Sequence, residues 1–481
     1  MPISGSNLFK NFFSTEEMRL VFSDETRVSY FLRTSVALAK VEAGLGLVPV
    51  PAYEEISRRA LSLTVNWERL RQDVEAFGYP VLPSLDQLGE ACGSAGEYLH
   101  WGAVTRDIAD IAFTLQLRDA LAILEAGAHR ICKLLRGMTE AYQSTVMLAR
   151  TDGMPSLPTT FGFRCAVWLT EVDRQAARIA ALRAGLVVGP FGNNANALAV
   201  LGERGGEVQS ALLRELGLEP PTDAWSSARE QISEIVFAIS ALASGMAGMA
   251  GTIATMSGSA VQELREPPPP GRRSGGTMPH AGCDRVMVQA RLATQNVSVV
   301  MEAVSQNHQR NWLGHLDALV VPQTFLLVHS ALNQMAAILD GLEVFPQRMR
   351  SNIDVAQGLA MADSVMATLA RKCGRRTAHR LVSRACEYAL REGQPLREAL
   401  LRSRDVTGLM STAEIDAALD PSAYLGSGPE LVEHVISQTE AWPVTGLGAS
   451  VGAPGAQPPP PDTPTPTQSH ARMTSGAPQA V

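Results

Sequence analysis

Between Glu234 and Glu263 the sequence reads IVFAISALASGMAGMAGTIATMSGSAVQ (residues 235–262), a stretch of 28 residues without a charged side chain. At about 1.5 Å per residue, a helix of this length could cross a bilayer. Ala, Gly, Ser and Thr dominate it, however, and no Trp/Tyr belt or Lys/Arg cluster marks either end. Small residues let neighbouring helices approach closely. The stretch therefore predicts a helix packed on all sides by others, at the centre of a bundle that subunits could share.

The rest of the chain predicts an all-α fold, because apolar residues recur at spacings of three and four rather than two. Long helices are expected at 111–145, 159–187, 203–217, 228–264, 284–312 and 318–346. Shorter helices are expected within 16–110 and 356–440. This pattern predicts a long central helix bundle flanked by two smaller helical domains.

The expected organisation is an N-terminal helical domain (1–110), the bundle (111–355), a C-terminal helical domain (356–442) and a tail (443–481). Gly, Pro, Ser, Thr and Gln dominate the tail, which lacks the apolar material to offset its ordering entropy. It is predicted to be a disordered, Pro-rich segment. The alternative is a Pro-rich ligand for an SH3-like partner.

The charge balance argues against one class of function. The 481 residues carry 41 Lys+Arg against 48 Asp+Glu, a formal charge of −7, which argues against a protein that coats nucleic acid, although a local basic site remains open. Six scattered cysteines without CxxC pairs predict reduced thiols and no structural metal. The start, MPISGSNLFKNFF, lacks the basic and apolar regions of a secretory signal, so we expect a cytoplasmic protein and no membrane partner.

Several stretches carry a family resemblance. In chain order they read FSDETR (22–27) with ALAKVEAGLGLVP (37–49), HWGAVTRDI (100–108), ARTDGMPSLPTTFG (149–162), EPPPPGRRSGGTMPH (266–280) and GRRTAHRLV (374–382). The chain resembles the fumarase/aspartase superfamily, specifically its 3-carboxy-cis,cis-muconate cycloisomerase and adenylosuccinate lyase branch. The resemblance covers roughly residues 15 to 440.

That resemblance implies elimination of an amine or oxygen leaving group from a succinyl skeleton, or the related lactone-forming addition. It implies that a loop serine serves as base, that a histidine serves as acid, and that a loop lysine and asparagine hold carboxylates. It also implies a homotetramer whose sites are assembled from loops of three subunits. Nothing resembles a P-loop, GxGxxG, HExxH or GxSxG, so no nucleotide or metal cofactor is expected.

The catalytic motifs depart from the family pattern. Where it has GSSxMPxKxNP, Gly275 and Gly276 replace the serines, and Ala281 and Cys283 replace the lysine and asparagine. The THxQ motif has become TDGM (151–154), and the family's Trp-His pair is Trp225 and Ser226. Losing one oriented donor typically costs about 2.7 to 4 kcal/mol in the transition state. Losing several together should abolish the ancestral elimination unless other residues substitute for them.

Three residues are the candidate catalytic set: His100, Asp152 and Ser274. His100 keeps its family position, with a structural hydrogen-bonding role as the alternative. Asp152 replaces the acid histidine, and a desolvated carboxylate can act as acid or base. Its alternative is a helix cap. Ser274 lies one residue before the usual serine pair, and its alternative is a solvated lid.

Candidate substrate-binding residues supply hydroxyl, amide or guanidinium donors and loop contacts: Thr105, Arg150, Thr151, Asn193, Asn194, Arg272, Arg273, Thr277 and Met278. Capping, turn formation and solvated surface charge are the alternatives. Cys283 is interpreted as an incidental thiol.

We expect an enzyme that acts on an anionic, carboxylated small molecule with a rewired acid/base set. The first alternative is a catalytically inactive homologue that binds a metabolite or partners an active lyase. The second is retained 3-carboxymuconate cycloisomerase or adenylosuccinate lyase activity.

Overall fold

The computed structural model describes residues 7–186, 188–192, 198–221, 230–268, 281–304 and 314–439. The chain divides into a unit of residues 1–443 and a unit of residues 444–481. The predicted tail (443–481) lies outside the described residues. Helices dominate the described part of the first unit, which confirms the all-α expectation.

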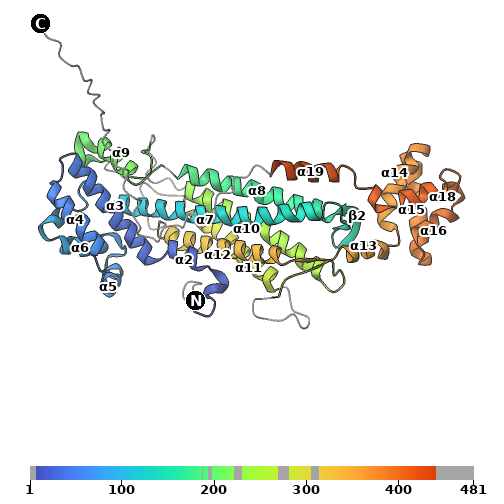
Figure 1. The fold of residues 1–481 in the computed structure, drawn as a ribbon, viewed down its shortest axis with the longest axis horizontal. Helices are drawn as coiled ribbons and strands as arrows, with labels where there is room; N and C mark the ends of the chain where they lie inside the picture. The colour runs from blue at the N-terminus through green and yellow to red at the C-terminus, as the bar shows by residue number, and fades with distance from the viewer. Residues whose placement is uncertain are drawn as a thin grey trace, which may run out of the picture. The chain divides into compact units, whose positions relative to one another are not determined.

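Long helices lie side by side in a bundle (Figure 1). They are α7 (Thr105–Ala141), α8 (Phe161–Gly185), α10 (Glu230–Ser257), α11 (Ala281–Glu302) and α12 (Gly314–Asp340). Each overlaps a helix expected from apolar spacing. Their inward faces share one buried core that includes Leu124, Leu169, Ile239, Val286 and Leu332. Removing this apolar surface from water is the main force that holds the bundle together.

Helix α10 contains most of the uncharged stretch, and it differs from expectation on one face. Ile235, Ile239 and Met246 are buried in the bundle core, but Phe237 is 55% exposed. The prediction that the helix is packed on all sides is therefore wrong for the single chain. By length and composition alone, α10 is also the one helix in the described part of the chain that could cross a membrane.

The N-terminal helices are shorter. They are α1 (Lys10–Phe13), α2 (Glu16–Val21), α3 (Asp24–Gly44), α4 (Val50–Ser62), α5 (Trp67–Phe77) and α6 (Val81–Cys92), followed by the 3-10 helix η2 (Gly93–Tyr98). Helix α2 packs on the bundle core through Met18, and α3 to α6 form further clusters, two of which include residues of α7. Ser23 caps α3 by accepting from the N–H of Thr26, and Asn66 caps α5 by accepting from Arg69. The 3-10 helix η3 (Ala199–Arg204) and α9 (Gly205–Glu215) share a buried cluster with α3 and α7.

The C-terminal helices are α13 (Pro346–Val355), α14 (Ala362–Cys373), α15 (Arg375–Glu392), α16 (Leu396–Arg402), α17 (Arg404–Thr407), α18 (Thr412–Ala418) and α19 (Gly428–Gln438), with the 3-10 helices η4 (Leu359–Met361) and η5 (Pro421–Ala423). Helices α14 to α18 enclose a separate core built on residues such as Val365, Leu381, Leu400 and Ile415.

Two short antiparallel strand pairs interrupt the helices. Strands β1 (Val146–Thr151) and β2 (Met154–Thr160) are antiparallel, as are β3 (Leu264–Arg265) and β4 (Glu343–Val344). Asp152 and Gly153 form the two-residue turn between β1 and β2, with φ of 51° and 77°. Positive φ at both positions is typical of a type I′ turn, for which Asp-Gly is strongly favoured. The interpretation of Asp152 as a helix cap is therefore wrong, and an Asp-Gly hairpin signal in the sequence was missed.

Candidate active site

His100 lies in the segment between η2 and α7, in a left-handed backbone conformation with φ of 60°. Its Nε2 atom is shielded from solvent and has no hydrogen-bond partner among the described residues. Burial lowers the pKa of the imidazole, and a hydrogen bond to the backbone of Val104 only partly opposes that effect. His100 is therefore neutral at neutral pH and can accept a proton from a ligand.

The beginning of α7 is fixed next to His100 by a residue that the sequence interpretation missed. The carboxylate of Asp107 accepts hydrogen bonds from the N–H of Val104 (3.0 Å) and from the N–H of Gly192 (3.1 Å). Asp107 is 1% exposed, so these bonds connect α7 to the segment at Gly192 away from solvent. An acidic residue at the third position of a helix is the sequence signal that could have identified it. Thr105, the first residue of α7, is half-buried beside this connection.

Helix α7 separates two groups of predicted site residues. His100 and Thr105 lie at its N-terminal end, whereas Arg150, Thr151 and Asp152 follow its C-terminal end. A helix of 37 residues spans roughly 55 Å. Figure 1 shows α3 and α6 at one end of the bundle and β2 at the other. One chain therefore does not bring the two groups together.

Thr151 and Asp152 are exposed at the tip of the β1–β2 hairpin. No hydrogen bond or ion pair of the Asp152 carboxylate occurs within the described part of the chain. In the single chain this carboxylate faces solvent rather than a desolvated cleft.

Arg150 has an internal partner that the sequence interpretation did not anticipate. Its guanidinium donates to both carboxylate oxygens of Glu263, at 2.6 and 2.8 Å, and Glu263 is fully buried. The Nδ2 of Asn352, from α13, donates to the same carboxylate at 2.8 Å. Arg150 thus forms an ion pair with a buried carboxylate within the chain, and its ligand-binding role stays a prediction.

The start of α11 follows the degenerate signature loop and is capped from within the chain. The N–H groups of Gly282 and Cys283 donate to the carboxylate of Glu266, at 2.7 and 3.3 Å. Cys283 is fully buried, and burial raises the pKa of its thiol, so the thiol stays protonated. This agrees with its interpretation as an incidental thiol.

Several predicted site residues lie outside the described residues: Asn193, Asn194, Arg272, Arg273, Ser274, Thr277 and Met278, together with Trp225 and Ser226. Within the described ranges, no group of three His, Cys, Asp or Glu side chains is placed to hold a metal ion.

The bundle face formed by α8, α10 and α11 carries an open groove of about 900 Å³. Among its lining residues are Val167, Trp168, Phe237, Gly245 and Thr294. Val167 and Phe237 are 46% and 55% exposed, so the groove presents apolar side chains to solvent. None of the described candidate site residues lines it.

Comparisons with known proteins agree along most of the chain. The sequence profile of the lyase family matches residues 10–281, and that of the adenylosuccinate lyase C-terminus matches residues 358–435. The 3-carboxy-cis,cis-muconate cycloisomerase of Pseudomonas aeruginosa is 33% identical, covering 91% of this chain and 98% of that protein. The N-acetyl-S-(2-succino)cysteine lyase of Dickeya dadantii is 31% identical, covering 92% and 97%. The crystal structure of a fumarate lyase from Mesorhizobium sp. matches with a TM-score of 0.84 and 35% identity, covering 88% of this chain and 98% of that one.

Proposed function

We propose that this chain, which belongs to the lyase family, is an enzyme that catalyses β-elimination, or the reverse addition, on a carboxylated small molecule. The family resemblance seen in the sequence is confirmed, and relatives at about 30% identity are lyases and cycloisomerases. The observation that carries the proposal is the Nε2 of His100, a buried ring nitrogen without a partner in the described residues. A buried polar atom without a partner is costly unless a ligand satisfies it.

The proposed chemistry is a proton transfer coupled to loss of a leaving group. The base takes the proton from the carbon beside a carboxylate, the C–H electron pair forms the new double bond, and the leaving group departs with its own bonding pair. The neutral imidazole of His100 suits the base, and the Thr105 hydroxyl can donate to the substrate carboxylate. Asp152 and Ser274 complete the proposed acid/base set.

This set requires more than one subunit, because α7, a helix roughly 55 Å long, lies between His100 and the hairpin that carries Asp152 in one chain. We propose a homotetramer in which hairpin tips and loops of neighbouring subunits complete each site. The groove on α8, α10 and α11 supports this, since exposed apolar surface is typical of an interface between subunits. Native mass measurement tests it, and a monomer at micromolar concentration would contradict it.

The activity is tested with compounds like those named for the relatives. Purified protein is assayed with N-acetyl-S-(2-succino)cysteine, 3-carboxy-cis,cis-muconate and adenylosuccinate, following product by absorbance and binding by thermal shift. We expect turnover of one of these carboxylated compounds and a loss of about 100-fold or more in His100→Gln. A His100→Gln variant that folds normally and keeps the full rate would exclude His100 as the base.

One observation favours the alternative of an inactive homologue. The carboxylate of Glu266 already accepts from the first amides of α11, next to Ala281 and Cys283, where the resemblance places the lysine and asparagine that hold substrate. In that case ligands raise the melting temperature without product formation, and stable mixed oligomers form with an active lyase. Detection of product from the purified homo-oligomer excludes this alternative.

A further inference from the structure

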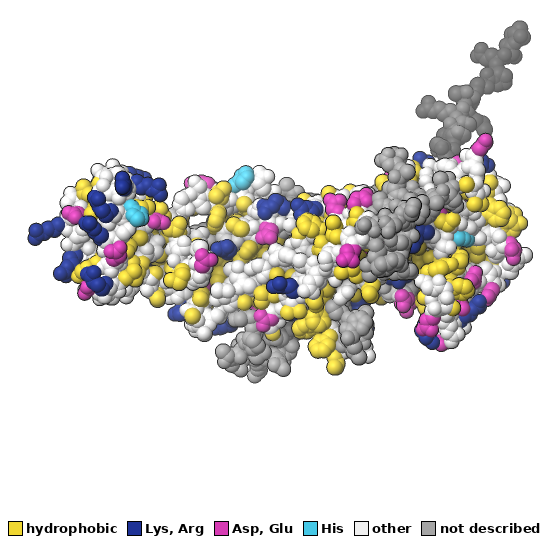
Figure 2. Space-filling model, turned by 180° about the vertical axis from the view of Figure 1, so that it is seen from behind, with side chains coloured by type: hydrophobic (Ala, Val, Ile, Leu, Met, Phe, Trp, Pro, Cys, Tyr) yellow, Lys and Arg dark blue, Asp and Glu magenta, His cyan; other side chains and the backbone are white. Residues whose placement is uncertain are grey.

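The surface of α14 and α15 carries five exposed arginines: Arg371, Arg375, Arg376, Arg380 and Arg384. We call this set the arginine face. None of the five has an ion pair, hydrogen bond or ring contact within the described part of the chain. Figure 2 shows Lys and Arg side chains gathered over the C-terminal helices. The chain as a whole has a formal charge of −7, so this local excess of positive charge is unusual for it.

Acidic residues of the neighbouring helices already form ion pairs with other basic side chains. Glu414 pairs with Lys372 at 2.5 Å, Asp416 pairs with Arg397 at 2.6 Å, and Glu392 pairs with Arg391 at 2.9 Å. Two other carboxylates, Asp363 and Glu387, add to the effect of burial in raising the pKa of Cys386, and within the described residues neither pairs with the arginine face. Within the described residues, the face therefore keeps its full charge in the folded chain.

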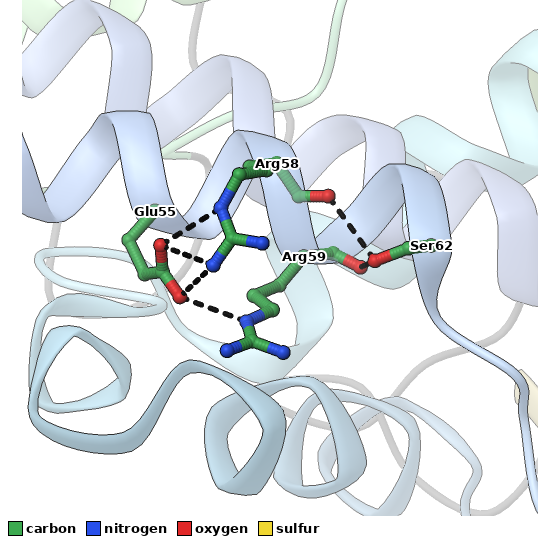
Figure 3. Close-up of polar contacts among 4 residues, drawn as sticks. All are labelled: Glu55, Arg58, Arg59 and Ser62. Atoms are coloured by element: carbon green, nitrogen blue, oxygen red, sulfur yellow. Dashed lines mark hydrogen bonds and ion pairs between the residues drawn. The ribbon is translucent and has the colours of Figure 1, made fainter.

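Helix α4 offers a contrast, because its two neighbouring arginines share an acidic partner on the same helix. There Arg58 and Arg59 both donate to Glu55, three and four residues earlier, and hold the pKa of that carboxyl at about 2 (Figure 3). On α15, by contrast, Arg376, Arg380 and Arg384 follow one another at spacings of four, which aligns like charges on one helix face. Such pairs weaken a helix. The arrangement costs stability locally, and an acidic partner would offset that cost.

We propose that the arginine face docks an acidic segment of another protein. The guanidinium group forms two parallel hydrogen bonds with a carboxylate, and a row of arginines along a helix can hold successive Asp or Glu side chains. Nucleic acid fits less well. In the described part of α14 to α16 the exposed large apolar side chain is Leu390, so the face offers no exposed aromatic ring on which bases could stack.

The experiment uses the full-length protein and a fluorescein-labelled oligoglutamate peptide, with fluorescence anisotropy at low salt. The test variant is Arg376→Gln/Arg380→Gln, and the matched control is Arg391→Gln/Arg397→Gln. Both remove two positive charges from the same group of helices, but only the control removes arginines that already have acidic partners. We expect the affinity of the test variant to fall about tenfold or more and that of the control to change less than about twofold.

Each of the following outcomes would overturn this proposal, and none of them depends on the proposed enzymatic activity. Equal weakening in both variants, or no peptide binding by the wild type, overturns it. Tighter binding of a labelled RNA oligonucleotide than of the peptide also overturns it, in favour of a nucleic-acid partner. A change in native mass of the test variant overturns it in favour of contact with a second copy of this chain. Circular dichroism verifies folding, and the thermal stability of the test variant should not fall, because it loses two like-charge pairs.

Discussion

Arg150 and Glu263, which are 113 residues apart in the sequence, are joined by two hydrogen bonds. The Arg150 guanidinium donates both of them to the fully buried carboxylate of Glu263. The pair connects β1 to the segment that follows α10, and Asn352 adds a bond from α13. It therefore joins three parts of the chain at the end of the bundle that carries the hairpin. This structural role stands beside the ligand-binding role expected for Arg150 from the sequence, which stays a prediction.

Replacing Arg150 should test that role directly. Arg150→Met leaves the buried Glu263 carboxylate with the Asn352 amide but without its charged partner, so we expect the free energy of unfolding to fall by about 3 to 5 kcal/mol. Arg150→Met/Glu263→Met should recover much of the loss, because no buried charge remains unpaired. Urea unfolding of both variants and of Glu263→Met, compared with the wild type, gives a double-mutant cycle that measures the coupling of the two residues. An Arg150→Met protein with wild-type stability but lost ligand binding would restore the substrate interpretation.

A substitution of Asp152 can test its role in turnover separately from its role in the β1–β2 turn. Asn-Gly suits a type I′ turn as well as Asp-Gly does, so Asp152→Asn should change the unfolding free energy by less than about 0.5 kcal/mol. If Asp152 serves in a site completed by another subunit, turnover of the substrate falls by orders of magnitude. Gly153→Ala is the structural control, since a Cβ at φ of 77° should cost about 1 kcal/mol. An unchanged rate in Asp152→Asn removes Asp152 from the mechanism.

Glu42 predicts a pH dependence of stability. Its side chain is fully buried, both carboxylate oxygens lack a partner among the described residues, and burial raises its pKa to about 8. The folded chain therefore holds a proton that the unfolded chain releases, and stability falls as pH rises from about 4.5 towards 8. Glu42→Gln should be more stable than wild type by a few kcal/mol at pH 8 and much closer to it at pH 5. If the unfolding free energy of the two proteins changed with pH in parallel, Glu42 would not be the source of this pH dependence.

His329 predicts the opposite trend in acid. Its Nδ1 is 2.7 Å from the Thr15 hydroxyl, and burial lowers the pKa of the imidazole to about 4. The unfolded chain binds this proton near pH 6.5 and the folded chain does not, so stability declines as pH falls from about 6.5 to 4. In His329→Gln the decline over this range should be shallower, as measured by chemical unfolding at several pH values. An equally steep decline would assign the acid sensitivity to other groups.

The positions of the long helices could be predicted from the sequence because their cause is local. Apolar residues repeating at three and four residues create one continuous apolar stripe on a helix, and α7, α8, α10, α11 and α12 all formed where such stripes occur. The Asp-Gly turn at 152–153 was equally local, but its short strands lay between two strong helical patterns. Its consequence, an exposed carboxylate at the tip of a hairpin, was therefore not anticipated.

By itself, the sequence determined the helical class, the family resemblance and the loss of the signature loop residues, since each depends on residue type and short-range spacing. Only the tertiary structure decided that Arg150 is held by Glu263, that Asp107 fixes the start of α7, and that α7 keeps His100 far from Asp152. These relations depend on which distant segments meet when the apolar faces pack together. Spacing along the chain contains no information about such encounters, because side chains close in sequence can be separated by a rigid helix and distant ones joined by a fold.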